Sequence, residues 1–198
     1  MLERLFDIIF SLVGIIILSP VLGLVALLIK LDSKESVFYR GTRVGRFGKS
    51  FKIYKFRTMV VNAEELGGPS TPEDDPRITK VGRFLRKYKL DELPQFISVL
   101  KGDMSVVGPR PEVPRYVEMY TDEERVILNV RPGITDWASI WNPNEGAILA
   151  GSADPERTYM EKIRPEKVRL QLRYVKEHSL WTDIGIILLT LKTIIRGN

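Results

Sequence analysis

The strongest constraint on this chain is an uncharged segment near its start. Residues 8–29 read IIFSLVGIIILSPVLGLVALLI and hold no charged side chain in 22 positions. A helix of that length covers the roughly 30 Å of a bilayer's hydrocarbon core. A signal peptide would need a small-residue cleavage site, which this stretch lacks, and a helix that is apolar on every side over this length is not expected as a buried core helix here. The segment therefore predicts a helix inserted in a membrane.

These residues alone do not decide whether the helix crosses the membrane or re-enters it. Ser19-Pro20 lies near its middle, and proline removes a backbone hydrogen bond and bends a helix, which spanning helices tolerate. Arg4 and Lys30 flank the segment, so positive charge does not distinguish its two ends. Only seven residues precede the segment, which leaves little chain to place across a bilayer. Crossing and re-entry, with both ends on one face, are equal alternatives here.

Charge and composition restrict the partners of the chain. Its 198 residues carry a formal net charge of +5, which favours an anionic partner: nucleic acid, anionic lipid or a phosphorylated substrate. There is no cysteine and one histidine, His178. Disulfides, thiolate zinc sites, a cysteine nucleophile and histidine-rich metal sites are therefore excluded. Any metal would be a hard ion bound through oxygen, with Mg²⁺ the first expectation.

Beyond the apolar segment the chain reads as an α+β domain. Residues 37–40 and 50–59 are rich in β-branched and aromatic side chains, and the glycines between them predict a β-hairpin. The string GRFGKS in that linker is not a phosphate-binding P-loop, because Arg43 replaces the first glycine. A loop is expected at 66–76, and an apolar tail over 180–197 should lie on a surface or in the core. Helices are expected at 78–90, 94–103, 114–129 and 165–179.

Two adjacent carboxylates, Asp91 and Glu92, stand in the stretch KYKLDELPQF just before a proline that fits the first turn of a helix. Acids at a helix start are common, because the dipole and free N–H groups there stabilise them, so the pair alone indicates little. A carboxylate that attacks a phosphoryl group needs cations, and usually Mg²⁺, to offset the repulsion between anions. Basic residues surround this pair in the sequence: Arg86, Arg110, Lys55 and Arg57. On a membrane-anchored unit, the pattern fits phosphoryl chemistry on a lipid.

Three strings carry a family resemblance: KFRTM (55–59), the run from DPRITKVGRF through LDELPQ and KGDMS to GPRPE (75–112), and VRPGIT (130–135). With them the chain closely resembles the bacterial monotopic phosphoglycosyl transferases, or bacterial sugar transferases, from its apolar segment to its C-terminus. Its length resembles their minimal catalytic form. The resemblance implies transfer of a phospho-sugar from a UDP-sugar to polyprenol (undecaprenyl) phosphate, with release of UMP. The product, a polyprenyl diphosphate sugar, would begin bacterial glycoconjugate synthesis.

The resemblance also implies roles for single residues. Asp91 would be the nucleophile that forms a covalent phosphosugar intermediate, Glu92 its acidic partner, and the two would hold Mg²⁺. Four basic residues would bind the substrate phosphates: Arg86, Arg110, Lys55 and Arg57. Asp183 and Arg131 would belong to the network around the active site.

For the fold, the resemblance implies an α+β protein with an N-terminal re-entrant membrane helix-break-helix over residues 1–31, broken at Ser19-Pro20. A catalytic domain over residues 32–198 would face the cytoplasm, with a small β-hairpin and several amphipathic interfacial helices around the active site. The expected location is the bacterial cytoplasmic (inner) membrane, monotopic, with both termini cytoplasmic. Expected partners are a UDP-sugar, polyprenol phosphate and inner-membrane lipid, without nucleic acid. The oligomeric state stays open, a homodimer included.

The chain leaves the family pattern after VRPGIT. Relatives commonly read G-W/L-A-Q-V-N-G-R there, whereas residues 136–155 read DWASIWNPNEGAILAGSADP. Reading a sugar needs apolar walls and hydrogen-bonding groups, and we expect them from Trp137, Trp141, Asn142 and Asn144. The alternative is a surface insertion that packs its tryptophans. Which sugar is transferred, and for which glycoconjugate, stays open.

Two other functions remain as alternatives. The basic faces could bind anionic lipid or nucleic acid without catalysis, although the chain has no nucleic-acid motif and a binding module has no need of an acid pair beside Arg86. A membrane phosphatase or lipid kinase would release inorganic phosphate or require a nucleoside triphosphate. Release of UMP from a UDP-sugar separates the transferase from both.

Overall fold

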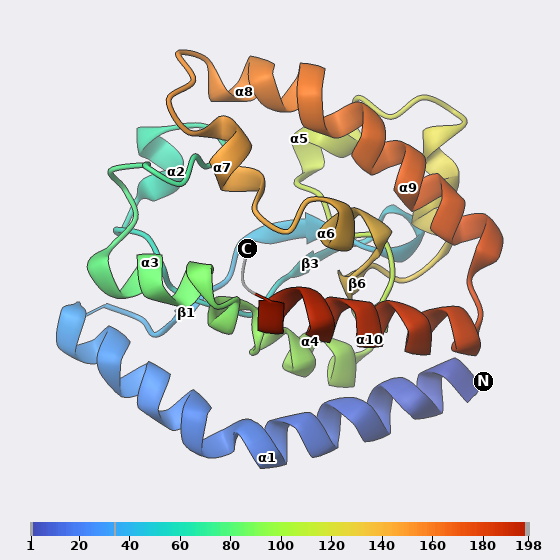
Figure 1. Cartoon of the computed structure of the whole chain (residues 1–198), viewed down its shortest axis with the longest axis horizontal. Coiled ribbons are helices and arrows are strands. Elements are labelled where there is room, and N and C mark those ends of the chain that lie inside the picture. Colours follow the sequence, from blue (N-terminus) through green and yellow to red (C-terminus); the bar gives the residue numbers. More distant parts are fainter. Residues whose placement is uncertain (1, 34, 197–198) are drawn as a thin grey trace.

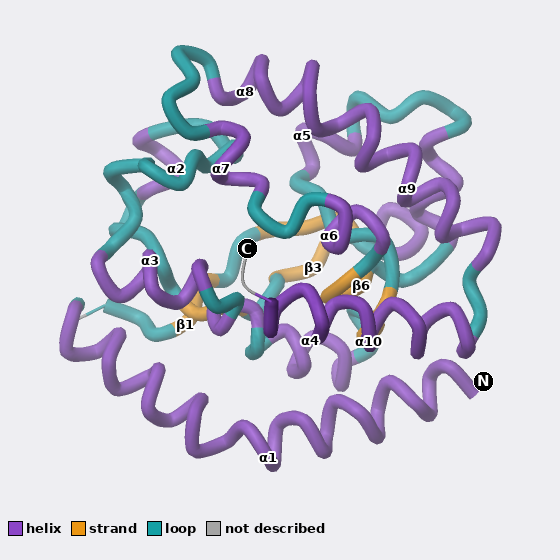
Figure 2. The backbone as a smooth tube through the Cα atoms, in the orientation of Figure 1, coloured by secondary structure: helices purple, strands orange, loops and turns teal. Residues whose placement is uncertain are grey.

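The computed structural model describes residues 2–33 and 35–196. It is a helix-rich fold with a few short strands, which lie in the middle of the molecule and are surrounded by helices (Figure 2). A long N-terminal helix runs beneath the rest (Figure 1). Residues 1, 197 and 198 lie outside the described residues, and so do the chain ends for which cytoplasmic placement is expected.

The apolar segment forms a single helix, α1 (Leu2–Asp32), with Pro20 inside it. It is the one helix in the described part of the chain that is long and apolar enough to cross a membrane. The helix bends in its middle (Figure 1). Pro20 has no N–H for the carbonyl of Ile16, and the Ser19 hydroxyl donates to that oxygen instead, at 2.8 Å. The predicted break is thus a bend in a continuous helix, because the serine replaces the hydrogen bond that proline removes.

Both ends of α1 pack against the same body. Near its start, the Arg4 guanidinium donates to the carbonyl of Val99 at the end of α4 (Gln95–Lys101), at 2.6 Å. The buried carboxylate of Asp7 accepts from the backbone N–H of Val106 at 2.9 Å.

The later half of α1 packs through two apolar side chains. Val25 and Ile29, which are 3% and 4% exposed, lie in one cluster with Phe56 and Leu85. Many other apolar side chains of α1 are exposed, among them Ile16, Ile17 and Leu24. This surface and the length of α1 indicate that the protein is located at a membrane.

The predicted hairpin is confirmed, with a shorter turn than expected. Strand β1 (Phe38–Tyr39) pairs antiparallel with β4 (Lys55–Phe56), and β2 (Thr42–Val44) pairs antiparallel with β3 (Ser50–Lys52). A 3₁₀ turn, η1 (Arg46–Gly48), joins β2 to β3, so the GRFGKS string is a hairpin turn as the sequence predicted.

The next elements follow their local signals. Helix α2 (Ala63–Leu66) precedes the expected loop, and α3 (Lys80–Lys87) begins where the Thr79 side chain accepts from the N–H of Gly82 at 2.9 Å. Helix α4 starts after Pro94 and ends at Gly102, whose φ of 87° is the left-handed conformation that favours glycine. The helices predicted at 78–90 and 94–103 are confirmed.

The helix predicted over 114–129 is wrong. The structure has two short pieces, α5 (Pro114–Val117) and η3 (Glu124–Asn129). Thr121 and Glu124 form a reciprocal pair in which the Thr121 N–H donates to the Glu124 carboxylate and the Glu124 N–H donates to the Thr121 hydroxyl. Such a capping box marks a new helix start, which divides the expected helix.

A parallel strand pair that the sequence did not reveal lies at the centre. Strand β5 (Ser105–Val107) pairs with β6 (Gly133–Thr135). A Cβ at Gly133 would lie 2.1 Å from the backbone nitrogen of Gly108, so only glycine allows this approach.

The remaining chain is helical. The predicted helix at 165–179 is confirmed as α9, and the apolar tail forms α10. These elements are α6 (Trp137–Trp141), α7 (Glu145–Leu149), α8 (Pro155–Thr158), the π-helical turn η4 (Tyr159–Ile163), α9 (Arg164–Glu177) and α10 (Leu180–Arg196).

The largest core cluster joins the hairpin, α4, β5 and the last two helices. Its buried members are Ile53, Val99, Met104, Val106, Val107, Tyr174 and Ile186. Through Val99 this core holds α4, the helix that follows the acid pair directly.

Candidate active site

A large cavity is lined by the hairpin, α3, the start of α4 and the segment 136–155, and also by α1 and α10. Its volume of about 2110 Å³ is roughly twice that of a large drug-sized site, so it can hold two substrates together. The walls contributed by α1 and α10 are almost wholly apolar, and include Phe10, Val13, Ile17, Leu191 and Ile194. Another part of the lining is charged and contains the acid pair and the predicted cations.

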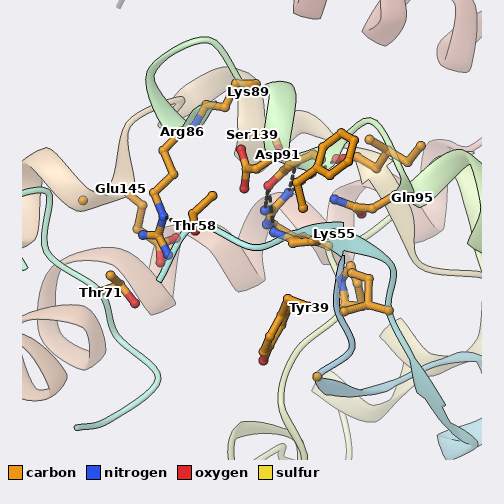
Figure 3. Close-up of a pocket in the computed structure, with 18 of the residues that line it drawn as sticks. Tyr39, Lys55, Thr58, Thr71, Arg86, Lys89, Asp91, Gln95, Ser139 and Glu145 are labelled. Atoms are coloured by element: carbon orange, nitrogen blue, oxygen red, sulfur yellow. Dashed lines mark hydrogen bonds and ion pairs between the residues drawn. The ribbon is translucent and has the colours of Figure 1, made fainter. Parts of the chain in front are cut away.

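The acid pair is held in a rigid place. Asp91 and Glu92 belong to a 3₁₀ turn, η2 (Leu90–Glu92), which runs directly into α4. Lys89 enters this turn with φ 57°, a left-handed conformation that reverses the chain after α3. Asp91 is 7% exposed and lines the cavity (Figure 3).

Glu92 is clamped by two cations from distant segments. Its Oε1 accepts from Lys55 Nζ at 2.9 Å and also from the Arg110 guanidinium, which binds Oε2 as well, at 3.0 Å. Burial raises the pKa of the Glu92 carboxyl, but Arg110 and Lys55 outweigh burial and hold it well below the usual value. Glu92 is therefore ionised, and its charge is matched by fixed partners.

Asp91 is in a different electrostatic state. Burial raises the pKa of its carboxyl above the usual value, with Lys55 and Arg86 opposing and the charge of Glu92 adding to the rise. No described residue donates a hydrogen bond to this carboxylate, so its oxygens remain available to a ligand in the cavity. Environments that push the pKa values of two adjacent acids apart indicate a division of roles.

The four predicted phosphate-binding residues all line the cavity. Lys55 and Arg110 are bound to Glu92, as described above. Arg86 donates from Nε to the Thr58 hydroxyl at 2.9 Å. Arg57 has a buried Nε that no described residue satisfies, which leaves a donor for a ligand.

Two predicted network residues lie away from the cavity. Arg131 donates from Nε to the carbonyl of Gly102 at 3.1 Å and so caps the end of α4. The Asp183 carboxyl lies 2.8 Å from the Tyr174 hydroxyl, and this hydrogen bond ties α10 to α9. Neither residue lines the cavity.

The four residues expected to select a sugar separate into two groups. Trp141 and Asn142 line the cavity, and Asn142 Nδ2 is buried without a partner among the described residues. Asn144 also lines the cavity, but its oxygen accepts from the Ala147 N–H and its nitrogen donates to Glu73. Trp137 packs against the largest core cluster and is absent from the cavity wall.

Sequence reasoning missed two residues at this site. Lys89 lines the cavity, and its charge lowers the pKa values of both Asp91 and Glu92. Gln95 also lines it, four residues beyond Asp91. The position of Gln95 one helical turn after the acid pair was a usable signal, whereas the left-handed backbone at Lys89 was not visible in the sequence.

The site fits Mg²⁺ through Asp91. No group of three or more His, Asp or Glu side chains gathers around a point in the described ranges 2–33 and 35–196. Mg²⁺ in phosphoryl-transfer sites needs fewer protein ligands, since one or two carboxylates and the substrate phosphates suffice. Both Glu92 oxygens already accept from cations. The geometry thus favours Asp91 over Glu92 as the ligand.

The chain is similar to known proteins over nearly all of its length. Residues 1–197 match the sequence model of the family described as "Bacterial sugar transferase". The chain is 42% identical, over 96% of its length, to the UDP-glucose:undecaprenyl-phosphate glucose-1-phosphate transferase of Escherichia coli K12. It is 38% identical, over 99% of its length, to the UDP-N-acetylgalactosamine-undecaprenyl-phosphate N-acetylgalactosaminephosphotransferase of Aeromonas hydrophila. An undecaprenyl-phosphate galactose phosphotransferase of Salmonella typhimurium is 38% identical over 98% of the chain.

These relatives are longer than the chain. It spans 39% of the Escherichia coli protein, 44% of the Aeromonas protein and 40% of the Salmonella protein. Their names give three different sugars, so the similarity does not select one.

Proposed function

Because the chain belongs to the bacterial sugar transferase family, we propose that it transfers a sugar phosphate from a UDP-sugar to undecaprenyl phosphate. The observation that carries this proposal is the unequal acid pair. Glu92 is neutralised by Lys55 and Arg110, while Asp91 has free oxygens that face a cavity with one polar side and one apolar side. The polar side suits a nucleotide diphosphate, and the apolar side suits an isoprenoid chain.

The reaction takes place in two displacements. A carboxylate oxygen of Asp91 attacks the phosphorus that bears the sugar, and the bond from that phosphorus to the bridging oxygen breaks. UMP leaves with the electron pair on the bridging oxygen. A phosphate oxygen of the lipid then attacks the same phosphorus, and the bond to Asp91 breaks, which restores the carboxylate and yields the lipid diphosphate sugar.

Basic side chains of the chain reduce the repulsion between the Asp91 carboxylate and the substrate diphosphate, which are both anions. Arg57 and Arg86 present guanidinium groups to the cavity, and Lys89 lowers the repulsion around the acid pair. Mg²⁺ bound by Asp91 and the diphosphate would neutralise charge on the phosphoryl oxygens. The Glu92 clamp fixes Lys55 and Arg110, so little reorganisation is needed when the substrate arrives.

In our proposal α1 re-enters the cytoplasmic face of the inner membrane, and the catalytic part stays on that face. The support is geometric. Arg4 and Asp7 at one end and Val25 and Ile29 at the other contact the same body, and a helix that crossed a bilayer would separate its ends by roughly 30 Å of hydrocarbon. The acceptor's isoprenoid chain can then reach the apolar cavity wall from within the membrane.

The test is UMP release by the purified, detergent-solubilised protein with undecaprenyl phosphate and a panel of UDP-sugars. Asp91→Asn should abolish turnover, because an amide does not attack phosphorus. Glu92→Gln should be severely impaired, yet it can retain a trace of the first displacement because Asp91 is intact. Near-normal UMP release by a folded Asp91→Asn protein would refute the assignment of the nucleophile.

A further inference from the structure

Gln95 carries a buried amide that no other described residue bonds. The residue is 1% exposed, and both Oε1 and Nε2 are buried without a hydrogen-bond partner among the described residues. It lines the active-site cavity. In Figure 3 the amide end of Gln95 points toward the side of the cavity that holds Lys55 and Asp91.

An unpaired buried amide lowers the stability of the fold unless a ligand supplies its hydrogen-bond partners. Buried side-chain polar groups in folded proteins nearly always have partners, and a missing partner destabilises the fold. Gln171 shows the ordinary arrangement, because it is also 1% exposed but donates from Nε2 to the backbone carbonyl of Arg110 at 3.4 Å. Gln95 departs from that arrangement at the edge of the acid pair, so a functional partner is the better explanation.

The backbone fixes Gln95 on the nucleophile's side. Leu93 and Pro94 have right-handed helical angles, so η2 continues into α4 without a break. Asp91 and Gln95 are four residues apart on this stretch, which places both side chains on one face, about one turn apart. Both side chains line the same cavity (Figure 3), so one ligand bound there can contact the Asp91 carboxylate and the Gln95 amide together.

We propose that Gln95 is a catalytic residue whose Nε2–H donates to a non-bridging oxygen of the phosphoryl group that Asp91 attacks. This inference rests on the proposed function. Phosphoryl oxygens are acceptors only, so they match the free amide donor. A neutral donor adds a hydrogen bond without attracting Glu92 away from its cations. The bond orients the phosphorus along the line of attack and persists while charge shifts between the oxygens.

The decisive variant is Gln95→Met, which keeps length and apolar volume but removes the amide. If Gln95 only supported the fold, this substitution would destabilise the protein. The proposal expects an unfolding midpoint equal to or above that of the wild type, because an unpaired buried amide disappears. It also expects kcat/KM for UMP release to fall about ten- to a hundredfold, the value of one hydrogen bond to a charged group. Gln95→Leu serves as a second apolar variant, and Gln95→Glu should lose more, because its charge repels the phosphate.

Gln171→Met is the matched control for stability. It removes a glutamine that has a partner, so its unfolding midpoint should fall while that of Gln95→Met does not. If Gln95→Met destabilises the protein as much as Gln171→Met does, or keeps wild-type kcat/KM, the inference is overturned.

Binding of inorganic pyrophosphate with Mg²⁺, measured by calorimetry, separates this inference from the proposed function. Wild type should bind this diphosphate probe, and Gln95→Met should bind it about tenfold more weakly. If no UDP-sugar led to UMP release, the proposed function would be refuted. The comparison of pyrophosphate binding between wild type and Gln95→Met would still test the role of Gln95. Equal binding by both proteins, or none by the wild type, overturns the role of Gln95.

Discussion

Replacing Asp183 by asparagine should stabilise the protein above pH 6. Asp183 is 5% exposed on α10, and its Oδ1 lies 2.8 Å from the Tyr174 hydroxyl. That hydroxyl is also 3.2 Å from the carbonyl of Val107. One phenolic hydrogen cannot serve both acceptors. If Asp183 is protonated, its O–H donates to the phenol and the phenol donates to Val107, so every group is satisfied.

The electrostatics point the same way. Burial is the largest cause that raises the pKa of Asp183, to about 6, and the carboxylates of Glu3 and Asp7 on α1 add to it. The hydrogen bond from Tyr174 and the charge of His178 oppose the rise but do not cancel it. The folded protein therefore binds this proton more tightly than the unfolded chain does.

The magnitude and the pH window follow from this difference. A pKa raised from 3.8 to about 6 corresponds to roughly 3 kcal/mol, at about 1.36 kcal/mol per pH unit. The contribution of this group is fully present below pH 4 and is lost as the pH rises through 6. An asparagine donates N–H to the phenol at every pH and avoids the loss. The stability of Asp183→Asn relative to wild type should thus grow between pH 4 and 7 and then become constant.

The assay is thermal unfolding of both proteins in one detergent from pH 4 to 8. For a chain of this length, 1 kcal/mol shifts the midpoint by about 2–4 °C. Subtracting the two curves removes the titration of groups that both proteins share. A difference that does not change with pH, or a wild type that is the more stable protein at pH 8, would show that the fold does not raise the pKa of Asp183 and that the reasoning is wrong.

Three further outcomes are expected. Excess EDTA should abolish UMP release and added Mg²⁺ or Mn²⁺ should restore it, because carboxylates and phosphates favour hard ions; full activity in EDTA would contradict this. Since the chain has no cysteine, single cysteines at Leu2 and Glu35 test the path of α1. Both should resist an impermeant thiol reagent in intact cells and react after permeabilisation, and labelling of Leu2→Cys alone would mean that α1 spans. Exchanging residues 136–155 for a relative's G-W-A-Q-V-N-G-R version should change the preferred UDP-sugar, and an active chimera with the original preference would exclude this segment as the selector.

Local signals were enough to predict many elements. Thr79 caps α3 with its own side chain, and Gly102 ends α4 through a left-handed backbone, so the information lies within a few residues of each helix end. The helix expected over 114–129 is wrong because the Thr121–Glu124 pair interrupts it, and this signal too is local. The pairing of β5 with β6 could not be read in this way, since it joins Ser105 to Gly133 across the chain.

The apolar helix, the acid pair and the basic residues that accompany it could be predicted from the sequence, because each is a matter of residue type and spacing. Their contacts and their electrostatic state came from the tertiary structure alone. Asp91 and Glu92 are neighbours with similar intrinsic acidity, yet Glu92 is clamped by Lys55 and Arg110 while Asp91 keeps its oxygens free. Those cations lie 37 and 18 residues away in the chain. Electrostatic energy depends on distance and burial in space, which the order of residues does not contain.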